Sequence, residues 1–121
     1  MTPEAAIYQF LSSFEIPAYA ASSTPEQAEY PYLTYNLAIP DYGQEASMQV
    51  DLWYYSDSEA QINAKAREMR SRIGLGGIVV LHDDGAIWLK RGNPWCQAVS
   101  DQENEMIKRR YINIDLEYLG D

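Results

Sequence analysis

The chain has almost no cysteine or histidine. Cys96 is its one cysteine, so no disulfide within the chain can brace the fold, which fits a reducing compartment such as the cytosol. His82 is its one histidine. Long apolar runs are missing too, and none approaches the length of a membrane span. Met1–Phe14 lacks the basic start and continuous apolar core of a signal peptide. The sequence therefore predicts a protein without an internal disulfide or membrane anchor.

Positive charge is also scarce. Lys and Arg number 9 against 18 Asp and Glu, which gives a formal net charge of −9. A strongly acidic surface repels phosphate groups, so sequence-independent binding to nucleic acid is disfavoured. Binding to anionic membranes is disfavoured for the same reason.

Apolar and aromatic residues are plentiful. The 121 residues are 46% hydrophobic and include ten Tyr and three Trp, which is a composition typical of folded proteins. The length fits one domain. We therefore predict a single folded domain over residues 1–121.

Two segments have the pattern of amphipathic helices. In the first, Thr2 can cap the helix, Pro3 suits the first helical position, and an apolar face runs from Ile7 to Phe14. In the second, Ser56 or Asp57 is the expected cap. Its apolar stripe consists of Ile62, Ala66, Met69 and Ile73, and the helix is expected to end at Gly74.

The remaining segments read as strands. Residues 33–39 and 46–55 alternate apolar and polar side chains around a turn at 40–43, and residues 18–28 read as a short strand and loop. In the last third, we expect strands at Ile78–Leu81, Ala86–Leu89, Trp95–Val99 and Lys108–Leu119. A hairpin turn is expected at Asp83–Gly85, a break at Gly92–Pro94 and a polar loop at Ser100–Glu105. Helices are too few to alternate with every strand. The sequence therefore predicts an α+β fold, in which an antiparallel or mixed sheet has two helices packed on one face.

No pattern of reactive residues predicts catalysis. A Cys96–His82 dyad is conceivable on paper, but packing explains Cys96 and turn formation explains His82 more simply. His82, Asp83 and Asp84 offer three metal ligands, yet consecutive turn residues rarely converge on one ion. Gly74–Gly77 follows a helix and lacks the Lys-Ser or Lys-Thr of a phosphate loop. We predict no catalytic residue, no cofactor and no metal site.

Two features point to interaction surfaces instead. Lys108, Arg109 and Arg110 form a basic run, which strand pairing could join to Lys90 and Arg91 as a docking patch. The alternative is pairing of these cations with the nearby acids at 101, 103 and 105. Aromatic residues are in surplus, which suggests a buried protein–protein contact or else a second small core under a loop. They are Trp53, Tyr54, Tyr55, Trp88 and Trp95. The predicted interface residues are Trp53, Tyr55, Trp95, Lys108, Arg109 and Arg110.

Several stretches together resemble a known family. They are Tyr30–Tyr35, Val50–Ser56, Ile73–Gly77, Ile87–Pro94 and Lys108–Asn113 with the strand that follows. From Tyr30 onward the chain resembles the tail terminator or tail-completion proteins found at the neck of long-tailed phages and prophages. None of these stretches carries a chemical signature, so the resemblance lies in the pattern of the fold.

The resemblance implies a structural role in the virion. Members of this family are α+β proteins that form a ring, often a hexamer, which caps the tail tube and joins it to the head. The implied partners are other copies of the chain, the tail tube protein and a head-side neck protein, and assembly takes place in the bacterial cytoplasm. DNA passes through the ring without specific binding, and an acidic channel wall would keep it from sticking. The family uses no cofactor and has no catalytic residues.

Three other functions remain open at this stage. The chain could be another neck component, such as a stopper or connector. It could be an acidic binding module that mimics DNA and regulates a host protein. An enzyme that depends on Cys96 and His82 is the third.

Overall fold

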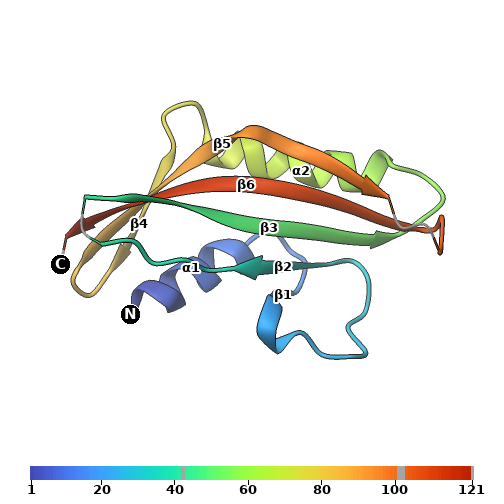
Figure 1. The fold of residues 1–121 in the computed structure, drawn as a ribbon, viewed down its shortest axis with the longest axis horizontal. Coiled ribbons are helices and arrows are strands. Elements are labelled where there is room, and N and C mark those ends of the chain that lie inside the picture. Colours follow the sequence, from blue (N-terminus) through green and yellow to red (C-terminus); the bar gives the residue numbers. More distant parts are fainter. Residues whose placement is uncertain (42, 101–102, 121) are drawn as a thin grey trace.

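The structure is a computed structural model that describes residues 1–41, 43–100 and 103–120. Over these residues the chain forms two α-helices, one short 3₁₀ helix and six strands in a single sheet (Figure 1). The predicted α+β class with a mixed sheet is confirmed. In the described part of the chain, neither helix is both long enough and apolar enough to cross a membrane.

Helix α1 spans Pro3–Ser12 and begins as the sequence predicts. The backbone N–H of Ala5 donates to Thr2 Oγ1 at 3.1 Å, so Thr2 caps the helix. Its apolar face, which includes Ile7, Phe10 and Leu11, is buried. Because this face needs a partner, α1 packs against the sheet instead of standing free.

Helix α2 spans Ala60–Ile73, and the cap predicted at Ser56 or Asp57 is wrong. Glu59 occupies the N-cap position without a side-chain cap. Ser56 Oγ instead accepts from the N–H of Ser58, and Ser58 Oγ accepts from that of Ala60. These serines shape a turn that delays the start of the helix. The end at Gly74 is confirmed, with φ +77° and its N–H on the Arg70 carbonyl.

The strands occur in the spatial order β1-β2-β3-β6-β5-β4. Their bounds are Ala18–Ala20 for β1, Tyr32–Asn36 for β2, Glu45–Tyr55 for β3, Ile78–His82 for β4, Gly85–Ser100 for β5 and Ile107–Gly120 for β6. The 3₁₀ helix η1 at Ala21–Ser23 follows β1. Strands β1 and β2 are parallel, and every other neighbouring pair is antiparallel. The sheet is therefore mixed, with β1 and β4 at its edges.

Two strand predictions need correction. Strand β2 ends at Asn36, so residues 37–39 lie outside the sheet. The break predicted at Gly92–Pro94 is instead a bulge inside one long strand, because β5 runs from Gly85 to Ser100 and its register against β6 shifts between Arg91 and Cys96. A bulge frees a backbone position from the ladder, so Pro94 can lie within the strand. Of the polar loop expected at 100–105, residues 101 and 102 lie outside the described residues, as does the residue at 42 in the first turn.

Both helices contribute to one hydrophobic core on one face of the sheet. Figure 1 looks onto the opposite face, with α1 and α2 behind the strands. Alternate residues of the long strands point into this core. They include Met48, Val50, Leu52 and Tyr54 of β3 and Ile112, Ile114, Leu116 and Tyr118 of β6. The sheet therefore has a core face and an outer face, and over the described residues no helix covers the outer one.

Candidate interaction surfaces

The outer face of the sheet carries a row of aromatic side chains at one end. The register places Tyr32 of β2 opposite Trp53 of β3, and Trp53 opposite Arg109 of β6. The rings of Tyr32 and Trp53 are stacked, with centroids 6.1 Å apart and an interplanar angle of 15°. The Arg109 guanidinium lies 4.7 Å from the centroid of the Trp53 ring, at cation–π distance. Three neighbouring strands thus build one continuous stack.

Further tyrosines extend this stack towards the β1 edge and the end of β3. Tyr19 of β1 contacts Tyr32, with ring centroids 6.0 Å apart. Tyr30 lies between Tyr32 and Tyr55, at 5.4 Å and 5.7 Å respectively. Tyr30 and Tyr55 keep 38% and 53% of their surface exposed. We call Tyr19, Tyr30, Tyr32, Trp53 and Tyr55 the aromatic band.

A buried carboxylate anchors the band. Asp51, on the outer face of β3, is only 5% exposed, and its Oδ1 accepts from Arg109 Nε at 3.0 Å. Gln49 Nε2 donates to its other oxygen at 3.3 Å. Trp53 Nε1 donates to Thr34 Oγ1 at 3.0 Å. These bonds fix the orientations of the Trp53 ring and the Arg109 guanidinium, so the band is a preorganised surface.

The opposite end of the outer face carries exposed aliphatic residues. Leu81 of β4 pairs with Ala86 of β5, and Ala86 pairs with Leu119 of β6. Leu81 and Leu119 are 75% and 38% exposed, and Val79 is 50% exposed. We call Val79, Leu81, Ala86 and Leu119 the aliphatic patch. It lies beside the free edge of β4, where unpaired backbone groups are available to a neighbouring chain.

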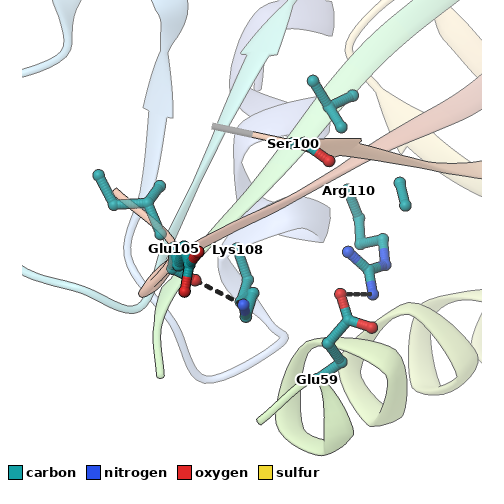
Figure 2. Close-up of a pocket in the computed structure, with 8 residues that line it drawn as sticks. Glu59, Ser100, Glu105, Lys108 and Arg110 are labelled. Carbon is teal, nitrogen blue, oxygen red and sulfur yellow. Dashed lines mark hydrogen bonds and ion pairs between the residues drawn. The ribbon is translucent and has the colours of Figure 1, made fainter. Parts of the chain in front are cut away.

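A polar pocket of about 300 Å³ lies between the start of α2 and the ends of β5 and β6 (Figure 2). Arg110 forms an ion pair with Glu59 at 3.2 Å and donates from Nε to Asn63 Oδ1 at 3.1 Å. Lys108 Nζ donates to the Glu105 carbonyl oxygen at 2.5 Å. The cations lining this pocket are thus engaged by groups of the chain itself, and Arg110 ties β6 to α2.

No protein-family model matches this chain, and neither a curated protein nor a solved structure matches it.

The structure divides the six predicted interface residues between the two faces. Trp53, Tyr55 and Arg109 lie on the outer face, and their part in an interface stays a prediction. Trp95 packs against the core and donates from Nε1 to the Ala66 carbonyl of α2 at 3.3 Å. Arg110 is also on the core side, only 6% exposed, and Lys108 shares its side of β6. The last three residues are therefore separated from the aromatic band by the sheet itself.

The single basic patch suggested by the sequence does not form. Arg91 pairs with Ile114 and Lys108 with Ser100, so the two basic runs lie far apart along β5 and β6. Lys90 instead forms ion pairs with Glu45 and with Glu117, which raise the pKa of its ammonium group. Charge pairing within the chain does occur, as the alternative interpretation proposes. Among the described residues, Asp51 of β3 pairs with Arg109, and Glu59 at the N-cap of α2 pairs with Arg110. Asp101 lies outside the described residues.

The surplus aromatic residues serve three different purposes. Tyr54 belongs to the core. Trp88 donates from Nε1 to the Gly76 carbonyl oxygen at 2.8 Å, and Lys90 lies 4.5 Å from its ring centroid, so the loop after α2 partly covers it. Trp53 and Tyr55 remain on the outer face. Coverage by a loop thus applies to Trp88, while a protein–protein contact at Trp53 and Tyr55 stays a prediction.

The residues once considered for chemistry are far apart. His82 is at the tip of β4, where Asp84 N–H donates to its Nδ1 at 3.3 Å, while Cys96 lies beyond the bulge of β5. Burial raises the pKa of the Cys96 thiol, which favours the unreactive protonated form, although Arg110 opposes this shift. Among the described residues, no three potential ligands come together as a metal would require. The structure therefore does not bring His82 and Cys96 together as a dyad.

Sequence reasoning missed Tyr19, Tyr30 and Tyr32 as members of the surface. The short strand expected within residues 18–28 is present as β1, but its three residues pair in parallel with β2, and no local signal places Tyr19 beside Tyr32. The alternation along residues 33–39 does separate Tyr32 from Tyr35, but it gives no sign that Tyr32 stacks on Trp53 of the next strand. In the structure Tyr35 is 8% exposed on the core face.

Proposed function

We propose that this chain is a structural subunit of a homo-oligomeric ring at the neck of a long-tailed phage, which caps the tail tube and joins it to the head. The observation that carries the proposal is the outer face of the sheet, which holds two exposed apolar surfaces at opposite ends. The pattern resemblance to tail terminator proteins supplies the biological setting.

Two different surfaces at opposite ends of one face favour a head-to-tail contact. The aromatic band lies at the β1–β2 side and the aliphatic patch at the β4 side. A two-fold dimer needs one self-complementary surface, whereas a contact between unlike surfaces repeats and can close into a ring. Exposed aromatic and aliphatic residues such as Tyr55 and Leu81 are typical of such contacts.

The test is the mass of the purified protein, alone and mixed with tail tubes, measured by light scattering and negative-stain electron microscopy. We expect rings, free or seated on tube ends. Leu81→Asp should prevent them, because it places a charge in the aliphatic patch. Leu75→Asp is the matched control, since Leu75 is 95% exposed in the loop after α2 and lies outside the patch. A wild-type protein that stays monomeric and ignores tube ends would overturn the proposal.

An acidic DNA mimic is the second candidate, favoured by the net charge of −9. Its distinguishing result is competition with DNA for a DNA-binding protein, measured by fluorescence anisotropy. A ring subunit should show no such competition.

A further inference from the structure

A pocket opens at the end of the aromatic band, away from the Trp53 stack. It has a volume of about 450 Å³ and is lined by Tyr30, Tyr55, Tyr54, Pro31, Glu29 and Gln61. Loop 29–31, the end of β3 and the first turn of α2 therefore meet at one point. Two of its walls are tyrosine rings, with Tyr30 and Tyr55 inclined at 45° to each other.

The chemistry of this lining favours a positively charged group. Aromatic faces carry negative potential and attract ammonium and guanidinium ions within about 6 Å of the ring centroid. Glu29 adds a carboxylate at the rim. The net charge of −9 adds a long-range field of the same sign, which raises the local concentration of cations.

The chain itself shows that its aromatic rings take cations. Arg109 lies over Trp53, Lys90 over Trp88 and Arg72 over Phe14, each at 4.5 to 4.7 Å. Within the described part of the chain, none of the Lys or Arg side chains is seated over Tyr30 or Tyr55. This tyrosine pair, with its carboxylate neighbour, is thus suited to a cation from outside the chain.

We propose that the pocket lined by Tyr30 and Tyr55 is a binding site for a Lys or Arg side chain of a partner protein. A side chain fits better than a free cation, because an exposed pocket with two ring walls binds an isolated ion weakly. The surrounding contacts of an interface position a cation that is part of a partner's side chain and slow its dissociation. The proposal does not depend on ring formation, since any protein partner with a protruding cationic side chain satisfies it.

The first experiment is a titration of the full chain, followed by NMR shifts of the tyrosine ring protons. The probes are N-acetyl-lysine methylamide, N-acetyl-arginine methylamide and tetramethylammonium chloride, with 3,3-dimethylbutan-1-ol as a neutral probe of comparable shape. We expect saturable shifts at Tyr30 and Tyr55 with at least one amino-acid probe and none with the alcohol. Equal binding of the alcohol would overturn the proposal, because the pocket would then be merely apolar. Saturation by tetramethylammonium alone would also overturn it.

Variants locate the site and separate its two attractive groups. Tyr55→Ala should weaken binding of the amino-acid probe by about two- to five-fold, the size of an exposed cation–π contact, whereas Tyr55→Phe keeps the ring and should bind within about two-fold of wild type. Glu29→Gln should also weaken it, and more so at low salt. Tyr8→Ala is the matched control, because Tyr8 is 50% exposed on α1 and lies outside the pocket.

The failure of this inference is distinguishable from failure of the ring proposal. If Tyr55→Ala binds the probes as well as wild type does, the pocket is not the site, whatever the oligomeric state. If the probes bind as expected while the protein stays monomeric on tail tubes, the site stands and the ring does not. Unchanged melting temperatures for the Tyr55 and Tyr8 variants show that a loss of binding does not come from a loss of folding.

Discussion

The ion pair between Asp51 and Arg109 makes the outer face of the sheet unusually sensitive to one substitution. Asp51 is 5% exposed, while the Arg109 side chain is 31% exposed and joined to it at 3.0 Å. Arg109→Met keeps an apolar chain over the Trp53 ring but removes the charge. The carboxylate of Asp51 is then left buried, and among the described residues only Gln49 donates a side-chain hydrogen bond to it. We expect the free energy of unfolding to fall as a result.

The magnitude follows from the unequal burial of the two partners. Removing one partner of a fully buried pair costs ~3–5 kcal/mol, because an uncompensated charge remains. Here water reaches the Arg109 side of the pair and can solvate part of that charge, so we expect about 2–3 kcal/mol. Asp51→Asn should cost less, about 1–2 kcal/mol, because a neutral amide needs no counter-charge and still accepts a hydrogen bond. The double variant should cost less than the sum of the two single changes.

Urea unfolding followed by tryptophan fluorescence measures all three variants. Arg67→Met is the control, since Arg67 is an exposed arginine on α2 and its loss should change stability by no more than ~0.5 kcal/mol. The reasoning is refuted if Arg109→Met is as stable as this control. It is also refuted if the single costs add without coupling, because the two groups would then act independently.

Two other predictions concern backbone geometry and pH. Gly77→Ala should destabilise the fold by about 3 kcal/mol or more in urea unfolding, because φ is +81° and a Cβ would lie 2.5 Å from both Leu89 O and Trp88 Nε1. The control is Gly43→Ala, which should cost only about 1 kcal/mol, because Gly43 has φ +76° but no atom within 4 Å of the added Cβ. Equal costs for the two variants would show that the close contact at Gly77 is unimportant. Burial raises the pKa of Tyr54, and Glu68 contributes further to this shift. The contribution of the neutral phenol to the stability of the fold is therefore fully present below pH 10.0, the ordinary tyrosine value, and is lost as the pH rises through the folded-state pKa. Absorbance at 295 nm and fluorescence across an alkaline titration should show phenol ionisation and unfolding together, and ionisation of every tyrosine without loss of structure would contradict this.

Those parts of the fold that follow from local periodicity could be predicted from the sequence. The alternation in β3 and β6 is long enough to specify which side chains point inward, and the core residues of both strands are buried as expected. The helix start at Thr2 and the helix end at Gly74 follow from local chemistry as well. These signals depend only on neighbours in the sequence, so they survive without knowledge of the tertiary fold.

The parts that failed depend on contacts between distant segments. Pro94 reads as a strand breaker, but the bulge opposite β6 accommodates it. Trp95 reads as a surface aromatic after a break, yet the same bulge directs it towards α2. Arg110 belongs to the predicted docking patch, although strand alternation puts it on the face of Ile112; its partners Glu59, at the N-cap of α2, and Asn63 come from a distant segment. The candidate site was accordingly predicted only in part, because a run of neighbouring residues on a strand is divided between two faces.

The pairing of cations within the chain connects the proposed roles of the outer face and the pocket. Lys90, Arg109, Arg110 and Lys65 all form ion pairs with carboxylates of the chain itself. Each pair removes one cation and one acid from the external field, so the excess of acids alone determines its sign. That field disfavours retention of DNA and favours a partner with protruding Lys or Arg side chains. Because salt screens charge contacts but does not weaken apolar burial, the response of assembly to salt tells which contact dominates. If rings dissociate as salt rises, cationic contacts such as the Tyr30–Tyr55 pocket hold them, whereas rings that tighten are held by the aliphatic patch.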